Sequence, residues 1–178
     1  MVERQDDELA GDQYRLAEEV LGAAGYGHYE LSSWALPDRE SRHNSAYWAR
    51  RAYTGIGAGA HSYDGVAERS WNVRELDRYL AGAEGGQRPI DGREELDAET
   101  RAFEAMALGL RRVGGLSRSE FGAEFGVDPL DRYARALRET AGDELMEVDG
   151  DRIRLTPSGR LLASEALVAF VPDRASRR

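Results

Sequence analysis

Apolar residues recur at helical spacing near the start of the chain, and a strand-like segment follows them. Residues 6–24 are predicted to form an amphipathic helix, because their apolar positions fall on one side. Gly25 stands where a helix ends, and the short aromatic stretch 26–32 is predicted to form a strand. This helix–turn–strand order is typical of parallel α/β folds. With no strand before its helix, it indicates the end of a longer unit.

The middle of the chain carries weaker signals. Residues 33–52 are predicted to be irregular, since they contain a proline, two charge clusters and three aromatic residues. Residues 72–82 are predicted to form a short helix with Asn72 as its N-cap. Residues 82–93 carry four glycines and one proline and are predicted to be a linker.

Beyond the linker the pattern becomes strongly helical, with one hairpin. The order of three helices, a two-stranded wing and a final helix predicts a winged-helix-like module. The expected elements are a helix over 97–112, a short helix capped by Ser117 or Ser119 and ending near Phe125-Gly126, a helix from Asp128-Pro129 to about Thr140, a hairpin around Asp149-Gly150, a last helix from Thr156-Pro157 through Phe170, and a disordered tail over 172–178.

Composition narrows the chemistry. The 178 residues include 33 acidic and 24 basic side chains, for a net charge of −9, and every basic residue is arginine. With no cysteine, the chain has no disulfide, thiolate nucleophile or Cys-ligated cluster. With no lysine, it has neither a P-loop lysine nor a Schiff base. No apolar run approaches the ~20 residues of a membrane span, and the start is too polar for a secretory signal. We therefore expect a cytoplasmic protein.

The first candidate site is the run His43-Asn44-Ser45-Ala46-Tyr47-Trp48. If it forms a helical turn, His43 and Tyr47 lie on one side, and the imidazole with its aromatic neighbours suits a flat ligand such as a porphyrin. Arg50-Arg51 would suit propionates or other carboxylates. The alternative is an Asn cap whose aromatic residues pack a loop, with arginines on the surface. His28 and His61, taken singly, are expected to be ordinary hydrogen-bonding residues.

The second candidate is the run Gly55-Ile56-Gly57-Ala58-Gly59-Ala60-His61-Ser62. In a strand, its three glycines would share one face without side chains, which a ligand or another backbone could approach closely. Close strand packing inside a barrel explains the same pattern.

A DNA-binding function is the competing interpretation of the winged-helix-like module. The recognition helix would be residues 128–140, in which Arg132, Arg135 and Arg138 lie along one side. The neighbouring acidic residues and the absence of lysine disfavour nucleic acid as a partner.

The motifs together resemble a known family. The runs are Gly25-Tyr26-x-x-Tyr29-Glu30-Leu31-Ser32, Arg42-His43-Asn44-x-x-Tyr47-Trp48, Gly55 through Ser62, and Trp71-Asn72. In this order they resemble the second half of the radical-SAM proteins of the oxygen-independent coproporphyrinogen III oxidase family. Residues 94–170 resemble that family's C-terminal domain. The His-Asn-x-x-Tyr-Trp run resembles the mark of its heme chaperone branch, HemW.

The resemblance implies an α/β plus mainly α fold. Residues 1–90 would be the last part of a partial TIM-like barrel, and residues 91–178 a winged-helix-like helical domain. It implies that heme or a porphyrin is held by His43, Asn44, Tyr47 and Trp48. It also implies that S-adenosylmethionine and substrate lie near Gly55, Ile56, Gly57, Gly59, Ala60 and His61.

One departure from the family limits the expected activity. The resemblance implies a 4Fe-4S cluster held by three cysteines, and this chain has none; Ser41 stands where relatives often have another cysteine. We therefore expect a C-terminal fragment that binds or transfers heme and is not catalytic alone. The alternative is oxidative decarboxylation of coproporphyrinogen III, completed by a separate cysteine-bearing N-terminal half.

Overall fold

The computed structural model describes residues 7–142 and 144–172. Its helices are α1 (Asp7–Ala23), α2 (Arg42–Trp48), α3 (Leu76–Glu84), α4 (Ala98–Leu110), α5 (Arg118–Phe125), α6 (Pro129–Arg132), α7 (Ala134–Gly142), α8 (Pro157–Leu161) and α9 (Ala163–Val168). Its strands are β1 (Gly27–Glu30), β2 (Ser33–Ala35), β3 (His61–Tyr63), β4 (Glu68–Asn72), β5 (Ile90–Glu95), β6 (Leu116–Ser117), β7 (Met146–Asp149) and β8 (Arg152–Leu155).

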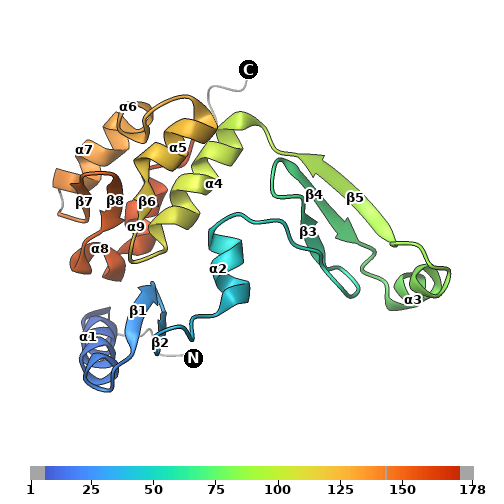
Figure 1. Cartoon of the computed structure of the whole chain (residues 1–178), viewed down its shortest axis with the longest axis horizontal. Coiled ribbons are helices and arrows are strands. Elements are labelled where there is room, and N and C mark those ends of the chain that lie inside the picture. Colours follow the sequence, from blue (N-terminus) through green and yellow to red (C-terminus); the bar gives the residue numbers. More distant parts are fainter. Residues whose placement is uncertain (1–6, 143, 173–178) are drawn as a thin grey trace.

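Figure 1 shows the arrangement of these elements. The helices of the second half form one body, α1 lies beside β1 and β2, and β3, β4, β5 and α3 form an arm that extends away from both. Helix α2 lies between these parts. Within the described ranges, no helix is long and apolar enough to cross a membrane. The tail that we predict to be disordered lies outside the described residues from position 173 onward.

The strands form small antiparallel sheets, with the orders β1-β2, β3-β4-β5 and β6-β8-β7. The mixed α/β class is confirmed, but the expectation of a parallel unit at the start of the chain is wrong. Strand β1 pairs antiparallel with β2, and His28 lies opposite Trp34. Only Leu31 and Ser32 separate the two strands, and so short a connection closes a hairpin but not a parallel crossover.

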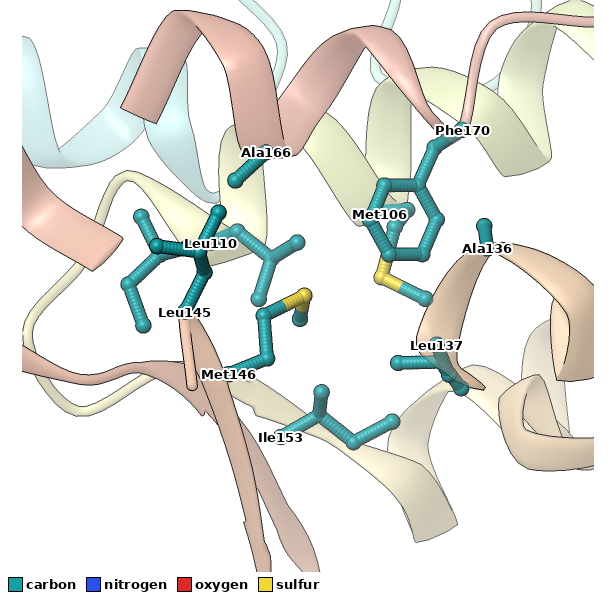
Figure 2. Packing of buried hydrophobic residues seen from close by; sticks show 10 residues of the cluster. Met106, Leu110, Ala136, Leu137, Leu145, Met146, Ile153, Ala166 and Phe170 are labelled. Atoms are coloured by element: carbon teal, nitrogen blue, oxygen red, sulfur yellow. The ribbon is translucent and has the colours of Figure 1, made fainter. Parts of the chain in front are cut away.

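The second half of the chain packs around a hydrophobic core (Figure 2). Met106 and Leu110 enter it from α4, Ile153 enters from β8, and Phe170 closes it after α9. Met106 and Ile153 are completely buried, so truncating either to alanine is expected to cost about 2–5 kcal/mol. This core fixes the frame on which the candidate site rests.

Local sequence signals set the ends of the core helices as predicted. The Ser117 hydroxyl accepts a hydrogen bond from the amide of Glu120 and caps α5, which ends at Gly126 in a left-handed conformation. Asp128 caps α6 in the same way, directly before a proline. Gly150 has a φ of +56° in the tight turn between β7 and β8.

Two of the predicted helices are interrupted. The helix expected over residues 128–140 is divided into α6 and α7 at Tyr133, and the last helix is divided into α8 and α9 at Leu162. Tyr133 leaves helical geometry, and its ring lies against the rings of Phe121 and Phe170, at centroid distances of 6.2 and 5.5 Å. Packing of a large ring into the core thus overrides the helical pattern.

The glycine-rich stretch is a loop, and the strand predicted there begins only at His61. Gly57 and Gly59 have φ values of +113° and +69°, which extended strands do not adopt. Asn72 is not a helix cap but part of β4, where its buried side-chain amide donates to the carbonyl oxygens of Gly55 and Gly57 at 3.2 and 2.9 Å. The side-chain amide therefore holds the loop in place.

Two other expectations in the arm are corrected. Helix α3 begins after Glu75, three residues later than the Asn72 cap would require. The segment predicted to be a linker includes the start of β5, which pairs antiparallel with β4. Strand β5 has the polar sequence Ile-Asp-Gly-Arg-Glu-Glu, so no alternation of apolar residues announces it.

The segment after α4 joins the second half of the chain to β1. The amide of Leu31 donates to the carbonyl of Arg111 at 3.0 Å, and the amide of Val113 donates to the carbonyl of Tyr29 at 3.2 Å. Glu30, between these two bonds, is 1% exposed and accepts from the Arg111 guanidinium. Residues 111–113 thus extend the small β1–β2 sheet and carry the next residues to the candidate site.

Candidate functional site

A cavity of about 660 Å³ lies between α2 and the segment 112–114. Its wall is formed by β1, by α2 with its flanking residues, and by that segment, which follows α4 in the chain. Cavities of ~300–1,000 Å³ are the usual size for small-molecule and cofactor sites. The cavity brings together two sequence regions that are about 70 residues apart.

Helix α2 lies within residues 33–52, which the sequence predicts to be irregular, and its N-cap is Ser41 rather than an asparagine. The Ser41 hydroxyl accepts from the amide of Asn44 at 3.3 Å, and the amide of Ser41 donates to the Tyr29 hydroxyl at 3.2 Å. The helical turn confirms the predicted pairing of His43 and Tyr47, whose rings meet edge to face at 4.8 Å. Tyr47 in turn packs on Tyr53 at 4.3 Å.

The four residues of the predicted heme motif do not all reach the cavity. His43 and the half-buried Trp48 line it, whereas Asn44 and Tyr47 do not. Trp48 packs against Tyr29, with ring centroids 5.9 Å apart, so the two aromatic rings form part of one wall. Tyr47 serves this wall indirectly, because it supports the His43 ring from the opposite side.

Two histidines border the cavity, and their hydrogen bonds distinguish them. His28 is engaged at both ring nitrogens: Nδ1 is 3.0 Å from Glu18, and Nε2 is 3.3 Å from the Tyr14 hydroxyl. Its ring also stacks on Trp34 at 4.3 Å, so it is a structural residue. His43 is exposed, and its ring nitrogens have no partner within the described part of the chain. Of the two, only His43 has a nitrogen ready to coordinate a ligand.

The residues expected near S-adenosylmethionine lie elsewhere. Gly55 through His61 do not line this cavity, and they belong to the arm. The loop backbone is held by its neighbours: the amide of Gly57 donates to the Tyr79 hydroxyl at 3.0 Å, and the amide of Gly55 donates to the hydroxyl of Ser62 at 2.9 Å.

Two features of the glycine loop bear on its role. Ile56, at the outer face of the loop, is 88% exposed, and Ala60 is only partly buried. A Cβ atom at Gly55 would stand 2.2 Å from the carbonyl oxygen of His61. Glycine is therefore required there by close backbone packing within the arm. The alternative considered above also assumes a close approach, but it places these residues in a strand, whereas they form a loop.

The pair Arg50-Arg51 is divided between two tasks. The Arg50 guanidinium binds both carboxylate oxygens of Glu124 on α5, and Arg101 of α4 contacts the same carboxylate at 3.4 Å. Burial alone would raise the pKa of Glu124, but the bond and charge of Arg50, with those of Arg101, outweigh it and hold that pKa below its usual range. Arg51 instead lines the cavity.

Sequence reasoning missed several residues of the cavity. The motif around His43 gives the Arg42 side chain no role of its own, and Arg112 and Gly114 come from the segment after α4, far along the chain. No spacing rule connects these positions to His43, because only the pairing of residues 111–113 with β1 brings them together. Their neighbours Arg111 and Gly115 have structural partners within the fold.

Comparisons with known proteins agree on one family. Residues 96–162 match the family model of the HemN C-terminal domain. The chain is 38% identical over 162 residues to the heme chaperone HemW of Mycobacterium tuberculosis, covering 89% of this chain and 38% of that protein. It is 31% identical over 166 residues to the HemW of Bacillus subtilis, covering 93% and 44%. The chain thus spans about two fifths of the length of these relatives.

One solved structure has a similar fold. Coproporphyrinogen III oxidase (HemN) from Escherichia coli, a radical SAM enzyme, aligns with a TM-score of 0.67 over 88% of this chain and 39% of that chain. The two sequences are 20% identical over the aligned region, so the likeness concerns the fold alone.

Proposed function

The chain corresponds to the C-terminal portion of the HemW heme chaperones, and on that premise we propose that it holds heme in the cavity beside α2. The observation that carries the proposal is the uncommitted imidazole of His43 at the edge of a cavity walled by Trp48. Histidine is a common axial ligand of heme iron, and a flat aromatic wall suits the porphyrin plane.

The residues of the cavity fit such a cargo. His43 would coordinate the iron, and Trp48 with Tyr29 would lie against the macrocycle. Tyr47 would hold the imidazole in place from behind. Asn44 would act through α2, where its amide meets the Ser41 cap. A chaperone needs a site from which heme can leave, and the exposure of His43 is consistent with transfer to an acceptor.

The chain does not fit a 4Fe-4S cluster by itself. The family's cluster requires cysteine thiolates, and none of the 178 residues is cysteine. These residues alone therefore support no radical step. The loop from Gly55 to His61 remains a prediction for the surroundings of S-adenosylmethionine, and exposed Ile56 would face a neighbouring ligand or chain there.

We also propose the division into a barrel part, residues 1–90, and a winged-helix-like part, residues 91–178. The match to the HemN C-terminal domain begins at residue 96, shortly after this boundary. Helices α5, α6 and α7, followed by the β7–β8 hairpin, support the winged-helix-like arrangement. Strand β5, which pairs with β4, starts at the boundary and would pass from one part to the other.

Titration of the full chain with hemin tests the heme proposal. We expect a Soret band that shifts and saturates on binding, and that changes in position and loses affinity in His43→Ala. The matched control is His61→Ala, which removes another exposed histidine outside the cavity. Identical spectra and affinities for the wild type and both variants would remove His43 as the ligand.

A further inference from the structure

Two pairs of adjacent arginines are each divided in the same way. In Arg50-Arg51, the first guanidinium binds Glu124, and in Arg111-Arg112, the first binds Glu30. In each pair the second arginine lines the cavity. In each pair, one arginine thus binds a carboxylate of the protein and the other faces the cavity.

The cavity arginines have no carboxylate of their own. Arg51, Arg112 and the third arginine of the wall, Arg42, make no ion pair or side-chain hydrogen bond with the residues that the structure describes. This is notable in a chain with more acidic than basic side chains, since carboxylates are plentiful. Glu40 is the acidic residue on the same wall. Three guanidinium groups against one carboxylate leave the cavity cationic.

The cationic wall has a definite ligand chemistry. A guanidinium group binds a carboxylate through two parallel hydrogen bonds, and water screens such a pair less where the site is partly enclosed. A ligand that presents two carboxylates to this wall would be preferred over an uncharged one of the same shape. The wall lies on the same cavity as His43, so one ligand meets both features.

Resting on the proposed function, we propose that Arg42, Arg51 and Arg112 bind the carboxylates of the porphyrin and select the dianionic form of the cargo. Because Arg112 follows α4, the HemN C-terminal domain contributes directly to cargo recognition. This assigns that domain a role in binding, in addition to its packing against β1.

The experiment compares hemin with hemin dimethyl ester, in which both carboxylates are neutral and the ring and iron are unchanged. We expect the full chain to bind hemin at least tenfold more tightly, and the preference to decrease as salt is added. In Arg51→Ala and Arg112→Ala, affinity for hemin should fall about tenfold, with affinity for the ester nearly unchanged. Arg78→Ala on α3, an exposed arginine outside the cavity, is the matched control.

A variant that is expected to tighten hemin binding excludes loss of folding as the explanation, because an unfolded protein would bind more weakly. Glu40→Gln removes the acidic side chain from the wall, so it should tighten hemin binding severalfold and leave the ester unaffected. Circular dichroism spectra of all variants should match the wild type.

The outcomes separate the two proposals. Equal affinity of the wild type for hemin and its ester, with both weakened in His43→Ala, would overturn the arginine wall and leave the heme site standing. Loss of both porphyrins in Arg112→Ala would likewise contradict carboxylate selection. Absence of any Soret change with either porphyrin would overturn both proposals together.

Discussion

Replacing Glu30 with glutamine tests how the cavity is held together. Glu30 is 1% exposed, and it accepts four hydrogen bonds: one from the Arg111 guanidinium at 2.5 Å, two from the amide and hydroxyl of Ser32, and one from the Ser33 hydroxyl at 3.0 Å. Glutamine has the same shape but no charge, and one of its two polar atoms is a donor. Whichever way the new amide is turned, its NH₂ group would face hydrogen-bond donors: either the Arg111 guanidinium or the groups of Ser32 and Ser33.

The expected loss is about 2–3 kcal/mol in the free energy of unfolding. Removing one partner of a fully buried ion pair costs about 3–5 kcal/mol. The Arg111 side chain is 38% exposed and regains hydration when its partner is lost, which lowers the cost. The hydrogen bonds from Ser32 and Ser33 go to a charged acceptor, and such bonds contribute up to about 3 kcal/mol each. Some of them persist with the neutral amide, which also lowers the cost.

Urea unfolding followed by far-ultraviolet circular dichroism measures this difference. The control is Glu19→Gln, which removes a charge from the exposed face of α1 and should change stability by less than about 0.5 kcal/mol. If Glu30→Gln unfolds within 0.5 kcal/mol of the wild type, the Glu30–Arg111 contact does not anchor residues 111–113 to β1. Other contacts would then hold the cavity wall together.

Two further predictions concern stability. Glu124→Gln should lower the free energy of unfolding by about 1–2 kcal/mol at pH 7, because it breaks the bond to Arg50. The folded pKa of Glu124 is lowered, so its contribution is full above the unfolded value of ~4.3 and is lost as pH falls through the folded value. The difference between variant and wild type should therefore shrink in urea titrations between pH 5 and pH 3; a difference that is constant with pH would refute the ion pair as its cause. Gly55→Ala should destabilise by about 1–3 kcal/mol, because its Cβ would clash with the carbonyl of His61, whereas Gly22→Ala in α1 meets open space and should stabilise by about 0.5–1 kcal/mol. Equal melting temperatures for these two glycine variants would contradict the close packing of the loop.

The sequence predicts the elements of the second half of the chain well, because their signals are local. A cap such as Ser117 and a left-handed glycine such as Gly126 act within one helical turn. The failures occur where a distant contact decides. At Tyr133 a helix is interrupted, and the Tyr133 ring packs against Phe170. Strand β5 forms from a polar segment because it pairs with β4.

The glycine stretch shows how an alternating pattern misleads. Alternating glycines fit one face of a strand, yet Gly57 and Gly59 adopt positive φ and the chain forms a loop. Asn72 stabilises this loop, but its position in the sequence predicts something else. An asparagine directly before an apolar run is typical of a helix N-cap. The role that Asn72 has in the structure is to donate hydrogen bonds to two carbonyls of the loop. That role depends on the pairing of β3 with β4, which a local pattern does not reveal.

In the candidate site too, the sequence predicts what depends on local geometry and misses what depends on distant contacts. The relation of His43 to Tyr47 spans four residues and follows from helical geometry, so the sequence predicts it. The cavity itself requires α2 to face residues 112–114, and two ion pairs set that relation: Glu30 with Arg111, and Arg50 with Glu124. Each pair uses the arginine adjacent to one that lines the cavity. Breaking either pair should therefore weaken the proposed porphyrin binding as well as folding, because both depend on the contact of α2 and β1 with the residues after α4.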